Sequence, residues 1–274
     1  MNTGALPNEW RGFHSIIFDC DSTLSAIEGI DELARIGGRY DEIKALTDAA
    51  MGGDVPLDQV YDRRLEILEP TRADIAAIAG QYREAAVTDA REVIGALHAA
   101  GKQVSIVSGG LLDAVRPFGL WLGVPEDHIR AVAIRYRTAS GAPVTESTAH
   151  RDDDRYLNTV SSLLTQTNGK STVAREMLSG TTGRSMLVGD GASDLVAAPD
   201  VDLFVGYTGV VERPRVAVEA DVLVTGTSLA PILGLALTAA EATTLEATPY
   251  RDLITRSRTM IQAGELTIQK DSSP

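Results

Sequence analysis

The sequence predicts a doubly wound α/β fold, in which helices cover both faces of a mainly parallel sheet, with a small all-helical domain inserted into it. Short apolar runs rich in β-formers recur along the 274 residues, without the polar alternation of strands that face water. Helical patterns separate several of these runs, and that alternation is typical of a parallel sheet. Between the first and second runs the pattern is helical only. An apolar content of 44% is sufficient for a sizeable core.

The predicted strands are continuous apolar runs at residues 15–18, 103–107, 185–188, 202–205 and 221–224. A helix is expected at 89–100, where Asp89 and Glu92 have the spacing of a capping box and Gly101 ends the pattern. A second short helix is expected at 169–180.

Residues 28–87 contain only helical segments separated by glycine pairs, and we interpret them as a cap domain. The catalytic core would then be discontinuous, with parts at 1–27 and 88–240, followed by a C-terminal extension at 241–274.

Two segments are less regular. Residues 134–169 are polar and rich in Ser and Thr, so a hairpin or loop is expected there, with Asp152 to Asp154 as exposed acidic side chains. The extension has apolar residues at helical spacing, which favour a stripe packed on the core; the alternative is a dimer contact. These residues are Tyr250, Leu253, Ile254, Met260 and Ile261. A monomer or a homodimer is expected.

Composition excludes several classes of partner. The formal net charge is −13 and no run of Lys and Arg offsets it, so we expect neither a nucleic-acid nor an anionic-membrane partner. The single cysteine allows no intrachain disulfide and no zinc thiolate set, which fits a reducing cytoplasm. Residues 1–14 lack the pattern of a signal peptide, and the longest apolar stretch, 228–240, is too short for a membrane helix.

Reactive side chains follow three of the predicted strands. Asp19 and Asp21 follow the first, Ser108 the second and Asp190 the third. Strand ends of an open α/β sheet form its ligand site, so these groups should be neighbours. Side chains two apart on an extended chain point the same way, so Asp19 and Asp21 would face one cleft. Taken alone, the Asp-Cys-Asp string is equally compatible with a capped turn.

The same strand ends offer ligands for a cation and for an anion. Asp19, Asp190 and the main chain beside Asp21 are hard oxygen donors suited to Mg²⁺. "VSGG" places the hydroxyl of Ser108 and free amides at an expected helix N-terminus, which favours an anion, and Lys170 could reach the same point. "NGKST" hints at a nucleotide P-loop, but Leu164 occupies the position that requires glycine.

"DCDST", "VSGG", Lys170 and "GDGASD" resemble, in order, the four motifs of the haloacid dehalogenase superfamily and, within it, of the phosphoserine phosphatases. The similarity continues through the helical insert and covers roughly residues 14–225. It implies a haloacid dehalogenase-like core with a helical cap. It also implies Mg²⁺-dependent hydrolysis of O-phospho-L-serine to L-serine and phosphate through an aspartyl-phosphate, the last step of serine biosynthesis.

The resemblance also implies a role for each site residue. Asp19 would be the nucleophile and Asp21 the general acid/base. Mg²⁺ would be held by Asp19, the backbone carbonyl of Asp21 and Asp190, with Asp194 supporting the metal or its waters. Phosphate or substrate would be bound by the remaining residues, namely Glu28, Met51, Gly52, Arg64, Ser108, Gly109, Lys170 and Ser193. Among these, Glu28 would take the ammonium of the substrate and Arg64 its carboxylate.

The chain departs from the family pattern in four places. Leu57 stands where Phe is usual, Ser193 replaces Asn or Thr, the segment 134–169 is long, and Pro117 should break or kink its helix.

Other functions are less compatible with these residues. The nearest alternative is a phosphatase of the same design acting on another small phosphomonoester, for which Glu28 and Arg64 would not matter. A dehalogenase would not need Asp21, and a phosphate sensor without turnover should lack Asp19 or Asp21. An ion pump with this chemistry would need membrane helices.

Overall fold

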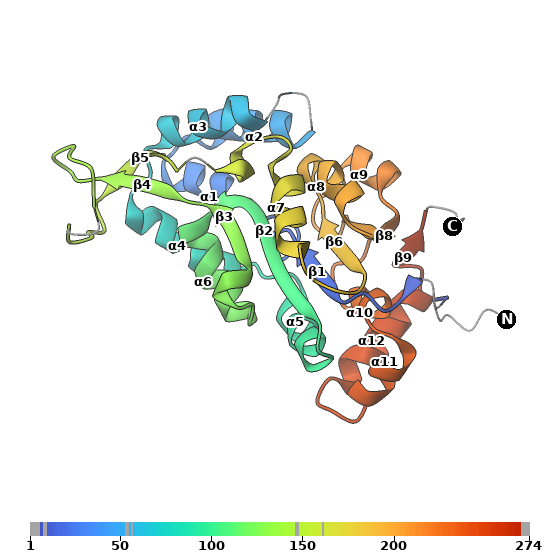
Figure 1. Cartoon of the computed structure of the whole chain (residues 1–274). Coiled ribbons are helices and arrows are strands. Elements are labelled where there is room, and N and C mark those ends of the chain that lie inside the picture. The colour runs from blue at the N-terminus through green and yellow to red at the C-terminus, as the bar shows by residue number, and fades with distance from the viewer. Residues whose placement is uncertain are drawn as a thin grey trace.

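The computed structural model describes residues 6–7, 10–52, 55, 57–145, 148–160 and 162–269, apart from the side chains of residues 51, 52 and 57–59. Within these ranges a seven-stranded sheet forms the centre of the molecule, in the order β3-β2-β1-β6-β7-β8-β9 (Figure 1). All neighbouring strands are parallel except β9, which is antiparallel to β8. The strands are β1 Ser15–Phe18, β2 Gln103–Leu111, β3 Ile129–Val132, β6 Ser185–Gly189, β7 Leu203–Tyr207, β8 Val222–Val224 and β9 Leu266–Ile268.

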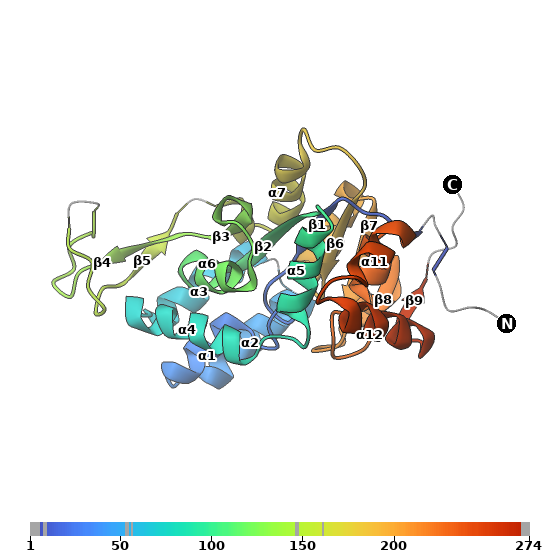
Figure 2. The same cartoon turned by 90° about the horizontal axis from the view of Figure 1, so that it is seen from below.

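The helices of the core cover both faces of this sheet, which confirms the predicted α/β class. Helices α7, α8 and α9 lie on one face, and α5, α6 and α10 to α12 lie on the other. Figure 2 shows α7 on one side of the sheet and α5, α11 and α12 on the other. Their bounds are α5 Ala90–Ala99, α6 Leu112–Leu122, α7 Gly169–Leu178, α8 Ala192–Ala197, α9 Pro214–Glu219, α10 Ile232–Ala236, α11 Ala239–Leu245 and α12 Arg251–Gln262. Short 3-10 turns occupy Glu126–His128, Leu163–Thr165 and Ala198–Asp200.

The topology reverses between β1 and β6. From β1 the chain proceeds through β2 to β3, whereas from β6 it proceeds in the other direction through β7 to β8. The two connections leave on opposite faces of the sheet, so a crevice opens at the carboxyl ends of β1 and β6.

Every predicted strand is present, but β3 and β9 were not predicted. β3 has only four residues, and Arg130 is exposed in its middle, so it lacks a continuous apolar run. β2 continues through Ser108, Gly109 and Gly110, and α6 begins only at Leu112. The motif "VSGG" therefore belongs to the end of the strand, and the expected helix N-terminus follows it directly, with Leu111 as the residue that precedes α6. The register between β2 and β3 shifts between Val107 and Leu111.

The structure differs from two expectations about the core helices. Pro117 lies inside α6, which continues to Leu122, so the expected break is absent, while a kink stays a prediction. Asp89 precedes α5 in a left-handed conformation and forms no side-chain cap. Its carboxylate instead accepts a hydrogen bond from Ser228 Oγ at 2.6 Å and pairs with Arg256 of α12.

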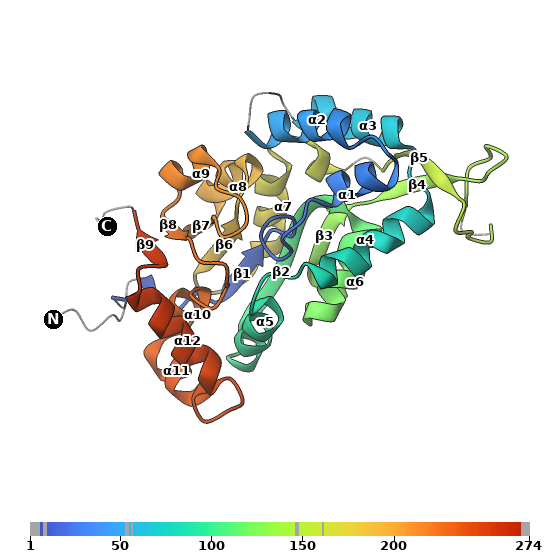
Figure 3. The ribbon, with the colours of Figure 1, turned by 180° about the vertical axis from the view of Figure 1, so that it is seen from behind.

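The insert between β1 and β2 consists of helices α1 Gly29–Ile36, α2 Tyr40–Gly52, α3 Leu57–Leu68 and α4 Arg72–Glu84. It lies beyond the carboxyl ends of the central strands (Figure 3). The chain enters and leaves it side by side, since Ala26 N donates to Ala85 O at 2.8 Å and Val87 N to Leu24 O at 2.9 Å. The division at 28–87 stays a prediction, and this pairing supports it.

The segment after β3 forms a hairpin of β4 Ile134–Arg137 and β5 Arg155–Thr159 that packs against α3. Asp152 and Asp153 are exposed, as expected, but Asp154 is fully buried. The hairpin folds back on the start of α4, where Arg72 N donates to Asp154 O at 2.8 Å. Asp154 Oδ2 accepts a hydrogen bond from Arg151 N at 2.9 Å. The prediction of a solvated side chain is thus wrong for Asp154.

The C-terminal extension packs on the core. Leu253 and Ile254 of α12 are buried, and α12 contacts α10. The remaining members of the apolar stripe are partly buried against the same cluster. Within the described ranges, no helix combines the length and the apolar character needed to cross a membrane.

Candidate active site

Three buried carboxylates meet at the carboxyl ends of β1 and β6. Asp19 directly follows β1 and its N–H donates to Val188 O at 2.9 Å, which places it beside Asp190 at the end of β6. Asp194 joins them from the first turn of α8. A methyl group on Gly189 would lie 2.3 Å from Asp194 Cγ, so only glycine admits this approach. One ligand oxygen from each of the three carboxylates lies within 4.8 Å of the others.

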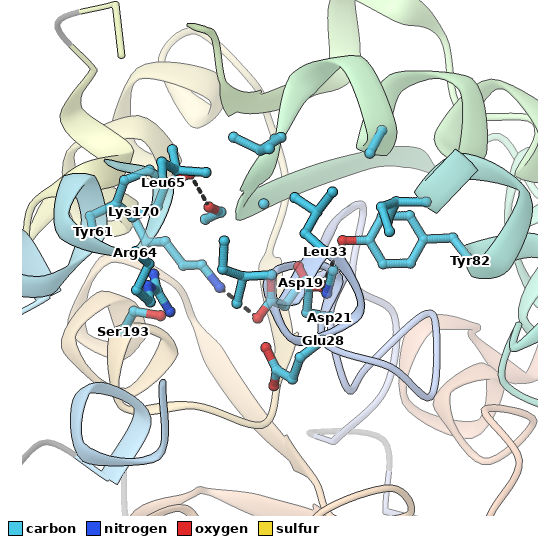
Figure 4. A pocket seen from close by; sticks show the side chains of 17 residues that line it. Asp19, Asp21, Glu28, Leu33, Tyr61, Arg64, Leu65, Tyr82, Lys170 and Ser193 are labelled. Atoms are coloured by element: carbon cyan, nitrogen blue, oxygen red, sulfur yellow. Dashed lines mark hydrogen bonds and ion pairs between the residues drawn. The ribbon is translucent and has the colours of Figure 1, made fainter. Parts of the chain in front are cut away.

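Lys170 bridges two of these carboxylates, and Figure 4 shows its ion pair with one of them, Asp19. It is the second residue of α7, and its ammonium lies 2.7 Å from Asp19 Oδ2 and 2.7 Å from Asp194 Oδ1. Burial alone would lower the pKa of Lys170, but the charges of Asp19 and Asp194 outweigh it and raise the pKa. The lysine therefore stays cationic beside Asp19.

Asp21 is held by donors from three segments. Its Oδ1 accepts hydrogen bonds from Gly29 N and from the hydroxyl of Tyr82, both at 2.7 Å. Its Oδ2 accepts a longer one, 3.3 Å, from Ser108 Oγ. Ser108 in turn accepts a hydrogen bond from Gly110 N at 2.9 Å. Asp21 is only 8% exposed, so these bonds define the orientation of its carboxyl group.

Arg213 is a charged member of this site that the sequence did not predict. It precedes α9, and its Nε donates to Asp190 Oδ2 at 2.8 Å while its Nη2 donates to Glu28 Oε1 at 3.0 Å. Glu28 also accepts a hydrogen bond from Ser22 Oγ at 2.9 Å. Nothing near Arg213 in the sequence resembles a motif. Its position after the predicted strand at 202–205 was the one local feature that could have indicated a role in the site.

The carboxylates of the site are buried close together, so their negative charges repel one another. Burial is the largest cause that raises the pKa of Asp190, to about 6. The charge of Arg213 opposes this shift, and the charge of Asp194 adds to it. Burial and then the charges of Asp21 and Asp190 raise the pKa of Glu28 to about 8. A divalent cation among the three clustered carboxylates would relieve this repulsion, and hard oxygen donors are the ligands Mg²⁺ prefers. The donor set therefore fits such a cation.

A pocket above the carboxylates brings most of the predicted substrate residues together. Its walls include Asp19, Asp21, Glu28, Arg64, Gly109, Lys170 and Ser193, as well as Tyr61 and Tyr82. Ser108, Asp190 and Asp194 are fully buried beneath it. The placement of Met51 and Gly52 relative to the pocket lies outside the described part, so their predicted role in substrate binding stays a prediction. The side chain of Leu57 lies outside it as well.

Arg64 reaches the pocket from α3 and is 5% exposed. Its Nη1 donates to Thr47 Oγ1 at 3.2 Å, and its guanidinium lies 5.4 Å from the centre of the Tyr61 ring. Its Nε has no hydrogen-bond partner among the described residues. Burial lowers the pKa of Arg64. A buried guanidinium with an unused donor favours an anionic group of a ligand at this point.

Comparison with known proteins finds phosphoserine phosphatases among the relatives of this chain. No family model matches the chain. Phosphoserine phosphatase from Bos taurus is 28% identical over 224 residues, 80% of this chain and 92% of the relative. The chloroplastic phosphoserine phosphatase of Arabidopsis thaliana is 29% identical over 221 residues, 78% of this chain and 70% of the relative.

A solved structure extends the likeness to three dimensions. A phospho-aspartyl intermediate analogue of phosphoserine phosphatase is 25% identical, has a TM-score of 0.63, and covers 81% of this chain and 98% of its own. These relatives confirm the resemblance carried by the ordered motifs. The chain is therefore similar, in sequence and in fold, to the phosphoserine phosphatases.

Proposed function

We propose that this protein hydrolyses O-phospho-L-serine to L-serine and inorganic phosphate, with Asp19 as the nucleophile. The relationship to phosphoserine phosphatases supports the reaction class. The observation that carries the proposal is the meeting of Asp19, Asp21 and Lys170 in one pocket with the buried Arg64.

The reaction would proceed in two displacements. A carboxylate oxygen of Asp19 attacks phosphorus, the bond to the serine oxygen breaks, and Asp21 gives that oxygen a proton. Water then attacks the aspartyl-phosphate, gives its proton to Asp21, and the bond to Asp19 breaks to release phosphate. Lys170, Ser108, the Gly109 amide and Ser193 would bind the phosphoryl oxygens.

Mg²⁺ is the metal we propose, held by Asp19, the Asp21 carbonyl and Asp190, with Asp194 behind them. When bound it would neutralise charge on the phosphoryl oxygens. Removal of metal with EDTA should abolish phosphate release, and Mg²⁺ should restore it. Full activity after exhaustive chelation would contradict this assignment. Serine biosynthesis as the pathway, a cytoplasmic location and a monomeric or homodimeric state stay predictions.

Selection of phosphoserine would depend on Glu28 and Arg64. The fork of Arg64 is suited to two parallel hydrogen bonds to the substrate carboxylate. Glu28 is paired with Arg213 in the absence of substrate, at 3.0 Å, and would exchange that partner for the substrate ammonium. Met51 and Gly52 would complete the same wall.

The test is phosphate release from O-phosphoserine and from phosphoethanolamine, which lacks the carboxylate. Asp19→Asn should abolish turnover of both esters. Arg64→Ala should raise KM for phosphoserine by roughly 10- to 100-fold, the equivalent of about 1.4–3 kcal/mol, and leave phosphoethanolamine nearly unchanged. Arg63→Ala is the matched control, because Arg63 is the neighbouring arginine of α3 and its side chain is 65% exposed.

The outcomes separate the reaction from the substrate. Normal turnover by Asp19→Asn would disprove the mechanism. An equal effect of Arg64→Ala on both esters would leave a phosphatase of another small phosphomonoester as the function.

A further inference from the structure

Tyr82 contacts Asp21 from a distant part of the chain. It belongs to α4 of the insert, its side chain is 1% exposed, and its hydroxyl donates to Asp21 Oδ1 at 2.7 Å (Figure 4). Neither the motifs nor the spacing of the sequence indicated this contact.

The phenol is held in place on two sides. Its ring stacks on Phe118 of α6, with 5.4 Å between the ring centres. On the other side Gly29 leaves the space for the hydroxyl, since a methyl group there would lie 2.2 Å from the phenol oxygen. Burial and the charge of Asp21 raise the pKa of Tyr82 well above its ordinary value, so the phenol keeps its proton and acts as the donor.

This contact makes the two oxygens of Asp21 unequal. Oδ1 accepts two short hydrogen bonds, from Gly29 N and from Tyr82, whereas Oδ2 accepts a single bond from the described residues, of 3.3 Å, from Ser108. A proton on Oδ1 would face two donors, so Oδ2 is the oxygen that can carry a proton. Oδ2 also lies beside Gly110, which lines the pocket.

We propose that Tyr82 is a positioning residue for proton transfer: it fixes the Asp21 carboxyl so that Oδ2 donates the proton to the departing serine oxygen. This inference rests on the proposed function. In the first displacement the bond from phosphorus to the serine oxygen breaks while the proton on Asp21 Oδ2 moves to that oxygen. A leaving group that departs without a proton has no need of this alignment.

The experiment compares two substrates that differ in this requirement. Serine leaves as a poor leaving group, whereas acetyl phosphate releases acetate, which needs no proton. The ratio kcat/KM is measured for both, because it reports the steps up to departure of the first product. Tyr82→Phe keeps the ring and its stack on Phe118 and removes only the hydroxyl.

Tyr82→Phe should lower kcat/KM for phosphoserine by roughly 10- to 30-fold, a part of the roughly 10²- to 10⁴-fold contribution of general acid catalysis. For acetyl phosphate the loss should stay below about threefold, since the acid acts only on the poorer leaving group. Tyr136→Phe is the matched control, because Tyr136 is also buried and donates to a carboxylate, Asp113 Oδ2, at 2.7 Å, outside the pocket. It should leave the ratio between the two substrates unchanged.

A second variant tests the same contact without removing the phenol. The methyl group of Gly29→Ala should push the hydroxyl away from Asp21 and produce the same selective loss. Circular dichroism and thermal melting establish that each variant is folded.

The kcat/KM values of the two substrates decide between the possible outcomes. A selective loss for phosphoserine supports the inference. An equal loss for both substrates, or no loss for phosphoserine in either folded variant, overturns it. Wild-type protein that does not hydrolyse phosphoserine contradicts the proposed function instead, before any variant is made.

Discussion

Metal-free protein is predicted to lose stability as the pH rises, because Asp190 is fully buried among other carboxylates. Its pKa is raised from 3.8 to about 6, with burial as the largest cause. Between these two pH values the native state binds the proton more tightly than the unfolded chain does. The contribution to stability is therefore fully present below about pH 4 and is lost as the pH rises through about 6.

The magnitude follows from the difference between the two pKa values. A shift from 3.8 to about 6 corresponds to about 3 kcal/mol of unfolding free energy. About half of that is already lost at pH 5, so about 1.5 kcal/mol remains to be lost between pH 5 and pH 8. Excess Mg²⁺ at pH 8 should offset the deficit, by about 2.7 kcal/mol at a hundredfold excess over its Kd.

The assay is urea denaturation in EDTA at pH 5 and pH 8, with Asp190→Asn as the reference because it removes the titrating group. Relative to that variant, wild-type protein should be less stable at pH 8 than at pH 5 by the stated amount. Mg²⁺ should then stabilise the wild type more than the variant. If the wild type and Asp190→Asn show the same difference at both pH values, the account of charge crowding is wrong.

Three further predictions concern single side chains. Lys170→Met should lower kcat by roughly 10²- to 10³-fold, since it removes a donor beside Asp19; phosphate release near the wild-type rate would refute that role. Asp154→Ala should cost roughly 1–3 kcal/mol in urea denaturation, while the exposed Asp153, replaced by Ala, should change stability by less than about 0.5 kcal/mol; equal effects would mean that burial of Asp154 is unimportant. Thr71→Ala removes the capping box of α4 and should cost about 1 kcal/mol, and an unchanged melting curve would count against that cap.

Residues that are close in sequence were the most predictable. The apolar runs identified the buried strands β1, β2, β6, β7 and β8, because a strand covered on both faces has no polar alternation. The carboxylates of "DCDST" and "GDGASD" follow two of those strands directly. Their meeting could be expected because the ends of parallel strands share one edge of the sheet.

The less regular elements were not predictable in this way. β3 is short and exposes Arg130, so its place depends on pairing with β2. Asp89 looked like a helix cap from its spacing to Glu92, yet Ser228 and Arg256 compete for its carboxylate. Those partners come from the far end of the chain, where no local pattern indicates them.

The fold class, the ordered motifs and the resemblance that they carry could thus be predicted from the amino-acid sequence, since each depends on local periodicity or on a short string of residues. The pairs of charges that neutralise one another, and the side chains that orient the reactive groups, became visible when the chain was folded. Arg213 reaches Glu28 and Asp190, and Tyr82 reaches Asp21, from segments far away in the chain. Such contacts exist because packing excludes water and leaves buried polar atoms to find partners within the protein, wherever the chain brings them.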